Sequence, residues 1–431
     1  MPARSVRIAT SIVVFAICAE LLGLAAYYIE TGALFYAHRK TYSPLLPTPG
    51  DRLVLAETVH PYFGFTHRPG TRFDIPERLR DGVAPYRLTT NNFGFVAPVD
   101  YPFRKTTPNQ FTIGLFGGSV GVWFCQLGAP RLVEQLKRSP AFSGKDVVPL
   151  CFSHEGYKQP QEALVLAYFL TLGQSFDLVV NIDGFNDVAL ASLNNDRGLD
   201  ISMPSVQHLD ALINAMNPSA LTPDKLETLA AIFRLRRRML DLQGTIARNR
   251  SAAVHVVLDL YYERLGDQYV RALGRFSTLP SNPTDNAFVQ SASPTRERDR
   301  ETMFTDIATT WAQSSVVMHE LLTARNVPYY HFLQPNQYFG ARRFTEAERT
   351  TALNDASPYK RSVEAGYPSL VAEGAALRQR GVRFVDATRA LDGEASPAYM
   401  DDCCHYTLAG NLTLADFVAA AILNPDVVRA P

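Results

Sequence analysis

A serine follows directly after two glycines in Gly117-Gly118-Ser119, the first segment of this 431-residue chain whose residue types suit chemistry. The apolar run FTIGLF precedes it and reads as a short strand. A serine in a glycine turn after a strand exposes its hydroxyl at the edge of a sheet, and the turn offers backbone N–H groups to developing negative charge. Taken alone, the segment is also typical of a plain tight turn.

A histidine that could serve this serine lies near the other end of the chain, in Asp402-Cys403-Cys404-His405. Imidazole is the usual base for a serine nucleophile, and a carboxylate beside it fixes its tautomer. Asp402, three residues before His405, is the expected partner, and Asp401 is its rival. The alternative interpretation is an aspartate that caps the last helix, beside a surface histidine.

Two further positions could donate hydrogen bonds to an oxyanion. Asn186 lies in Gly184-Phe185-Asn186-Asp187, after a strand, and its side-chain amide is a donor. Gly156 follows another strand and would offer its backbone N–H group. Each is also compatible with an ordinary turn, since glycine, asparagine and aspartate favour turns.

The elements that must position these residues alternate along the chain. Apolar strands, each running into a turn or loop, are expected within 111–119, 146–156, 176–187, 327–337 and 381–388, and helices near 130–138, 159–172 and 408–423. Short apolar strands alternating with helices predict an α/β fold with a parallel sheet covered on both faces. Ligands bind at the carboxyl ends of such strands, where Ser119, Gly156, Asn186 and Gln334 all fall.

The order of these segments resembles the SGNH hydrolase superfamily, also called GDSL esterases and lipases. FGGS is similar to the first block of that family, Gly156 to its second, GFND to its third and DCCH to its fifth. The resemblance covers roughly 111–190 and 327–425. It departs from the family at Gly118, where aspartate is common, although the serine is kept. It implies a three-layer α/β/α, flavodoxin-like fold.

The resemblance also implies roles for the site residues. His405 would deprotonate Ser119, with Asp402 orienting His405, and the oxyanion would be held by Ser119, Gly156 and Asn186. Ser119 would attack an ester of a glycan or a lipid, small acyl groups such as O-acetyl being expected, without cofactor or metal. An O-acyltransferase with the same triad, or a non-catalytic subunit of a membrane complex, are the alternatives.

The segment HFLQPNQYF resembles a segment of membrane-anchored bacterial members of the same superfamily. It places Gln334 and Asn336 among the expected substrate-binding residues.

Residues 8–28 are almost entirely apolar and long enough to cross a bilayer. Arg4 and Arg7 precede them, which favours a cytoplasmic N-terminus, an inner-membrane anchor and a periplasmic main domain. A cleaved signal peptide is the alternative. Glu20 is costly within a membrane, so it indicates either a partner in a membrane complex or a protonated or interfacial position.

Three regions are expected: the anchor and stalk at 1–40, an irregular preface at 41–110, and the hydrolase-like domain at 111–431, interrupted by a helical insertion at about 188–326. Within the insertion, apolar residues at steps of three or four predict one amphipathic helix: Leu229, Ile232, Leu235, Met239, Leu242 and Ile246. Its arginines could meet anionic lipid or an acidic polymer, or simply form a solvated face: Arg234, Arg236, Arg237 and Arg238. Residues 280–300 are expected to form a mobile loop.

The formal net charge is zero, so nothing suggests a nucleic-acid partner. Four cysteines lie outside the apolar segment, and an oxidising compartment permits two disulfides. We expect a bond from Cys403 or Cys404 to Cys125 or Cys151, which would fix the histidine loop. A vicinal Cys403–Cys404 bond or buried free thiols are the alternatives.

Overall fold

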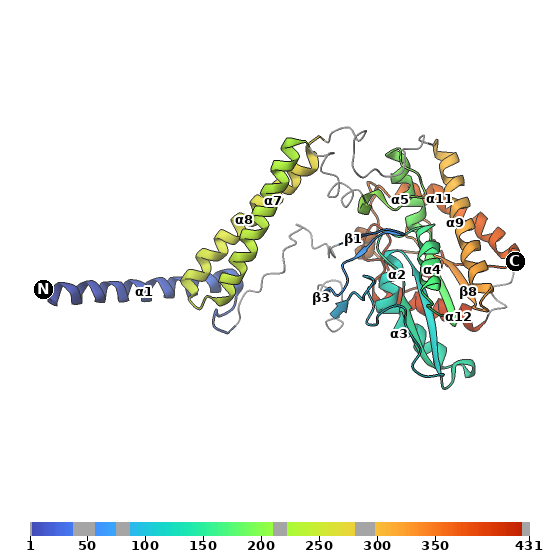
Figure 1. Ribbon diagram of the computed structural model, residues 1–431, viewed down its shortest axis with the longest axis horizontal. Helices are drawn as coiled ribbons and strands as arrows, with labels where there is room; N and C mark the ends of the chain where they lie inside the picture. Colours follow the sequence, from blue (N-terminus) through green and yellow to red (C-terminus); the bar gives the residue numbers. More distant parts are fainter. Residues whose placement is uncertain (1, 38–56, 75–86, 210–221, 281–297, 425–431) are drawn as a thin grey trace. The chain divides into compact units, whose positions relative to one another are not determined.

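The computed structural model describes residues 2–37, 57–74, 87–209, 222–280 and 298–424 (Figure 1). The chain forms two compact units. One comprises residues 1–54 and 214–289, and the other comprises residues 55–213 and 290–431. The predicted boundary at residue 41 and most of the loop predicted at 280–300 lie outside the described residues.

The larger unit is built on a five-stranded parallel sheet with the order β6-β5-β7-β8-β9. The chain moves from β5 to one neighbour, then returns past β5 to the other side, which is a flavodoxin-like order. Every residue of β7 and β8 is buried, so the sheet is covered on both faces. The predicted α/β fold with a parallel sheet is therefore confirmed. The strands are β5 (Gln110–Gly117), β6 (Asp146–Cys151), β7 (Leu178–Asp183), β8 (Tyr329–Leu333) and β9 (Arg383–Asp386).

The helices of this unit fall into two packed groups. In the first, α3 (Ala129–Lys137) contacts α12 (Leu408–Leu423), and both contact the π-helical turn η2 (Phe124–Gly128). In the second, α9 (Arg300–Thr323) contacts α4 (Gln161–Thr171), α5 (Phe185–Asp196) and α11 (Lys360–Gln379). Shorter helical segments are α2 (Ser119–Trp123), η3 (Pro140–Phe142) and α10 (Glu346–Ala352).

The preface contains two antiparallel pairs of short strands, β1 (Glu57–His60) with β2 (Gly64–His67), and β3 (Arg72–Asp74) with β4 (Arg87–Thr89). Its aromatic residues belong to the main core rather than to a core of their own. Phe63, Phe65 and Phe95 are fully buried and pack around Tyr157, next to Gly156. The preface thus forms part of the support of the predicted site.

The smaller unit consists of α1 (Pro2–Thr31), α7 (Pro223–Arg248) and α8 (Ala252–Thr278). The predicted amphipathic helix is α7, since Ile232, Met239, Leu242 and Ile246 are buried in one cluster with Leu265 and Tyr269 of α8. The predicted insertion also contained α9, which the structure places in the larger unit. Among the described residues, the segment Thr10–Thr31 of α1 alone is long and apolar enough to cross a membrane.

Candidate active site

Ser119 is the first residue of α2, directly after β5. The chain turns sharply there because Gly117 has a φ of +148°, and a Cβ atom at Gly117 would lie 2.3 Å from the carbonyl oxygen of Ile182. Both features require glycine. Since the first N–H groups of a helix have no intrahelical acceptor, the turn presents the N–H of Ser119 beside its own hydroxyl.

Gly118 explains the departure from the family pattern. A Cβ atom at this position would lie 2.2 Å from the Nδ2 atom of Asn186. The Asn186 amide therefore occupies the space that a side chain at residue 118 would need. The turn between β5 and α2 and the turn between β7 and α5 come this close because β5 and β7 are neighbouring strands.

The structure brings Ser119 and His405 together across 286 residues. The Nε2 atom of His405 lies 2.8 Å from Ser119 Oγ. The Nδ1 atom of His405 lies 2.5 Å from Oδ2 of Asp401, and not from Asp402. The predicted pairing of Asp402 with His405 is therefore wrong, and the rival residue is the partner.

The loop from Asp401 to His405 closes on the Asp401 side chain. Its Oδ1 atom accepts hydrogen bonds from the backbone N–H groups of Cys403, Cys404 and His405, at 3.0, 3.0 and 3.2 Å. One carboxylate oxygen thus shapes the loop while the other orients the imidazole. Asp402 points elsewhere, and its Oδ2 accepts a hydrogen bond from Asn354 at 2.7 Å.

Asp401 and His405 each stabilise the charged form of the other. Burial opposes ionisation of Asp401, but the charge and hydrogen bonds of His405 outweigh it and lower the pKa of Asp401 to about 2. Burial likewise lowers the pKa of His405, yet the Asp401 charge and hydrogen bond outweigh that effect and raise it to about 9. Asp401 therefore stabilises the imidazolium that forms when Ser119 loses its proton.

Asn186 and Tyr157, the residue after Gly156, lie beside the turn that carries Ser119: a Cβ atom at Gly118 would meet Asn186 Nδ2 and, at 3.1 Å, the carbonyl oxygen of Tyr157. Asn186 Nδ2 donates to the carbonyl oxygen of Tyr157 at 2.7 Å, which uses one of its two amide hydrogens. Gly156 has a φ of +77°, and a Cβ atom there would lie 2.4 Å from the imidazole of His208. Glycine is therefore required at the position that presents this N–H group.

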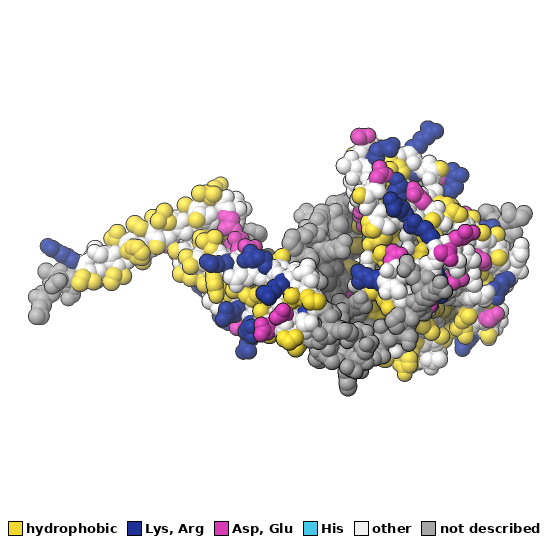
Figure 2. All heavy atoms as spheres, turned by 90° about the horizontal axis from the view of Figure 1, so that it is seen from above, with side chains coloured by type: hydrophobic (Ala, Val, Ile, Leu, Met, Phe, Trp, Pro, Cys, Tyr) yellow, Lys and Arg dark blue, Asp and Glu magenta, His cyan; other side chains and the backbone are white. Residues whose placement is uncertain are grey.

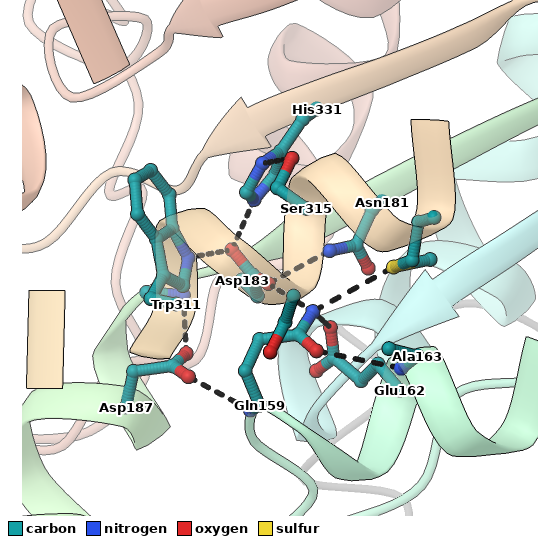
Figure 3. A network of polar contacts seen from close by, with 12 residues as sticks. Gln159, Glu162, Ala163, Asn181, Asp183, Asp187, Trp311, Ser315 and His331 are labelled. Atoms are coloured by element: carbon teal, nitrogen blue, oxygen red, sulfur yellow. Dashed lines mark hydrogen bonds and ion pairs between the residues drawn. The ribbon is translucent and has the colours of Figure 1, made fainter. Parts of the chain in front are cut away.

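A buried polar network lies below these turns and holds them in place (Figure 3). Asp187 accepts hydrogen bonds from the N–H groups of Gln159, at 2.8 Å, and Gly184, at 3.1 Å. It therefore ties the turn that carries Gly156 to the turn that carries Asn186. Burial and the Asp183 charge raise the pKa of Asp187 to about 7.

Asp183, the last residue of β7, is the centre of this network. Its oxygens accept hydrogen bonds from Trp311, His331 and Asn181, each at 2.7 Å (Figure 3). Burial disfavours its charge, but His331 and the surrounding donors outweigh burial and lower its pKa. No sequence pattern singled out Asp183 or Gln159, although GFND does contain Asp187.

Gln334 and Asn336 were expected to contact substrate, but both are buried. Asn336 Nδ2 donates to the carbonyl oxygen of Cys403 at 3.2 Å, and its Oδ1 accepts from Tyr338. The Gln334 N–H group continues the strand by donating to the carbonyl oxygen of Asp183. Asn336 therefore supports the Asp401–His405 loop, whereas the Gln334 backbone joins the end of β8 to the end of β7.

The cysteines pair differently from the prediction. Cys125 is bonded to Cys151, while Cys403 and Cys404 are free thiols with their sulfur atoms 3.5 Å apart. The disulfide joins η2, which follows the Ser119 helix, to the end of β6, which precedes Gly156. The disulfide therefore links the segment after Ser119 to the segment before Gly156. The loop that carries His405 is held by the hydrogen bonds to Asp401 instead.

Two clusters of side chains near the site could bind a metal ion, because the candidate ligand atoms in each cluster lie within 4.8 Å of one another. The clusters are Cys403-Cys404-His405 and His67-His154-Glu155. The first shares His405 with the serine pair. In the second, His67 Nε2 is bonded to Glu155 at 2.7 Å. Proton transfer between Ser119 and His405 requires no metal.

No family model matches the chain, and no curated protein matches it. Among solved structures, it is similar to the crystal structure of a GDSL-like lipase from Bacteroides thetaiotaomicron. The two are 11% identical with a TM-score of 0.34, over 75% of this chain and 93% of that chain.

Proposed function

We propose that this protein is a membrane-anchored serine ester hydrolase that works through Ser119, His405 and Asp401. The observation that carries the proposal is the continuous contact from Ser119 Oγ through the His405 imidazole to Asp401, with distances of 2.8 and 2.5 Å. Imidazole placed between a hydroxyl and a half-buried carboxylate is an arrangement that activates a serine nucleophile.

The reaction follows from these contacts. Ser119 Oγ attacks the carbonyl carbon of the ester and gives its proton to His405 Nε2. The N–H groups of Ser119 and Gly156 and the second amide hydrogen of Asn186 stabilise the oxyanion. The intermediate collapses to an acyl-serine, and the departing alcohol takes the proton from His405. Water, deprotonated by His405, then releases the carboxylic acid.

Two features favour a substrate class. The anchor helix α1, with arginines in its first turns, favours a periplasmic main domain, and the family resemblance favours small acyl esters, such as O-acetyl groups on glycans. Lipid esters are the alternative. Transfer of the acyl group to a hydroxyl acceptor uses the same steps, with an alcohol in place of water.

The test uses the full-length protein in detergent. We expect hydrolysis of p-nitrophenyl acetate and covalent labelling by a fluorophosphonate probe, both abolished in Ser119→Ala. Ser139→Ala is the matched control, because Ser139 precedes η3 on the strand-entry side of β6. Equal labelling of Ser119→Ala and the native protein would contradict the proposal and favour a non-catalytic subunit. Labelling with hydrolysis that appears only when an alcohol acceptor is added would favour acyl transfer.

A further inference from the structure

The carboxylate of Glu20, in the middle of α1, is bonded to groups of its own chain. Its Oε1 accepts from the N–H of Ala252 at 2.7 Å and from the Tyr36 hydroxyl at 2.6 Å. Its Oε2 accepts from Ser251 Oγ at 2.5 Å and from the N–H of Ala253 at 3.3 Å. Ala252 is the first residue of α8, so Glu20 caps that helix. This accounts for Glu20 without a contact to another subunit.

Close packing continues beyond this cap. A Cβ atom at Gly23 would lie 2.3 Å from the backbone nitrogen of Ala253, so the backbones of α1 and α8 touch there. Further along, Tyr27, Phe35 and His255 form an aromatic cluster with ring centroids 5.1 to 5.2 Å apart. One side of α1 from Glu20 onward therefore faces protein.

Only the face of α1 that packs on α8 becomes buried at the same place. Phe15 is 75% exposed and Leu22 is 72% exposed, whereas Tyr27 is 1% exposed; Tyr28 and Ile29, on other faces, remain 54% and 84% exposed. The helix from Pro2 to Leu22 would be about 31 Å long at about 1.5 Å per residue, close to the roughly 30 Å of a bilayer core. Such a core includes Arg4 and Arg7 near its inner end, where long basic side chains extend to the headgroups.

Two exposed arginines lie beside the Glu20 cap: Arg248 is the last residue of α7, and Arg250 is in the loop between α7 and α8. Arginines are costly at mid-membrane. If the hydrocarbon core were centred on Thr10–Thr31, these two arginines would lie near the middle of the membrane. If the core ends near Leu22, they lie at its outer edge.

The first three turns of α8 expose apolar side chains. Val257 is 66% exposed and Leu260 63%, and Val254 and Tyr261 lie on the same helical face. The one charge between Ala252 and Tyr262 is Asp259, which is buried. Charges return at Glu263 and Arg264. Figure 2 shows hydrophobic side chains along α1 and on the α7–α8 hairpin, interspersed there with basic ones.

We propose that the hairpin tip, residues 248–261, lies in the outer headgroup layer of the membrane that α1 spans. Val254, Val257, Leu260 and Tyr261 face the acyl chains, and the two arginines at 248 and 250 bind lipid phosphates. An anionic lipid surface fits because apolar and basic groups are adjacent at one end of the hairpin. The inference rests on the membrane anchoring within the proposed function, and not on the esterase activity.

The experiment uses full-length protein in vesicles of phosphatidylcholine and phosphatidylglycerol, with Cys18, Cys403 and Cys404 replaced by serine. A nitroxide is attached to a single new cysteine, and its collisions with oxygen and with a water-soluble nickel chelate are compared. The test position is Val257→Cys. Arg271→Cys, exposed on the same face of α8 four turns further on, is the matched control, and Phe15→Cys reports on the anchor.

We expect oxygen-dominated collisions at residues 15 and 257 and nickel-dominated collisions at residue 271. Glu20→Ala should restore nickel access at residue 257, because the cap that holds α8 on α1 is lost. Nickel access at 257 with lipid contact at 15 would overturn the hairpin proposal while the anchor stands. Nickel access at both positions would overturn the anchor as well. Exclusion of both reagents at 257 would mean that protein covers this face, which also overturns the proposal.

Discussion

Asp401 holds His405 through both oxygens of one carboxylate: Oδ2 lies 2.5 Å from the imidazole Nδ1, and Oδ1 accepts the N–H of His405 itself. The same carboxylate therefore holds both the backbone of the Asp401–His405 loop and the His405 imidazole. Since the neighbouring Asp402 points to Asn354, the two adjacent aspartates can be separated by experiment.

Asp401→Asn should lower kcat by about ten-thousand-fold, because the amide no longer fixes the imidazole tautomer or stabilises its cation. Asp402→Asn should stay close to the native rate, since the Asp402 carboxylate accepts a hydrogen bond from Asn354 whereas the His405 imidazole is paired with Asp401. Steady-state hydrolysis of p-nitrophenyl acetate and the rate of fluorophosphonate labelling measure both. Equal losses in the two variants would contradict the assignment of Asp401.

The pH profile should follow the raised pKa of His405. Only the neutral imidazole accepts the serine proton, so kcat/KM should rise with pH and level off above about 9. In Asp401→Asn the residual activity should level off at lower pH, because the charge that raises the pKa is gone. A native profile that is flat from pH 6 to 10 would contradict this role of His405.

The same pKa makes a prediction for stability. The folded pKa lies above the ordinary value of 6.5, so the Asp401–His405 pair stabilises the fold fully below pH 6.5. That contribution should decline as pH rises through about 9. Urea unfolding of native protein and His405→Ala at pH 6 and pH 10 should show a larger difference in unfolding free energy at pH 6.

Gly118→Ala should lower kcat by about a hundred-fold or more, the loss expected when one oxyanion donor is displaced. Its added methyl group would lie 2.2 Å from Asn186 Nδ2. Gly393→Ala is the control, because a Cβ atom there has no neighbour within 4 Å. Circular dichroism and turnover are measured together, so that misfolding is separated from loss of the donor. Native turnover in Gly118→Ala would show that the Asn186 amide is dispensable.

Cys125→Ala with Cys151→Ala should destabilise the larger unit by roughly 3 kcal/mol, from the entropy of a loop closed over a separation of 26 residues. Cys403→Ser should have a much smaller effect, since that thiol is free. Urea unfolding measures both. Peptide mapping without reduction should recover Cys125 linked to Cys151, and a Cys403–Cys151 peptide would contradict the pairing.

The local pattern of the sequence determined much of this protein. Short apolar strands alternating with helices predicted the parallel sheet, and α12 begins and ends where the apolar run 408–423 does. Ser119, Gly156 and Asn186 were predictable as neighbours because each follows a strand of one parallel sheet. His405 was predictable because few residue types can serve as a serine's base.

Tertiary structure decided what spacing along the chain cannot encode. Asp401 and Asp402 are adjacent, and only the closed loop turns the first toward His405. The cysteine pairing depends on the β5–β6 neighbourhood, which brings Cys151 to the segment after Ser119. Glu20 accepts a hydrogen bond from Ser251, 231 residues away, at the start of α8. In each case the chemical group could be found in the sequence, but its partner depended on side-chain direction and chain packing.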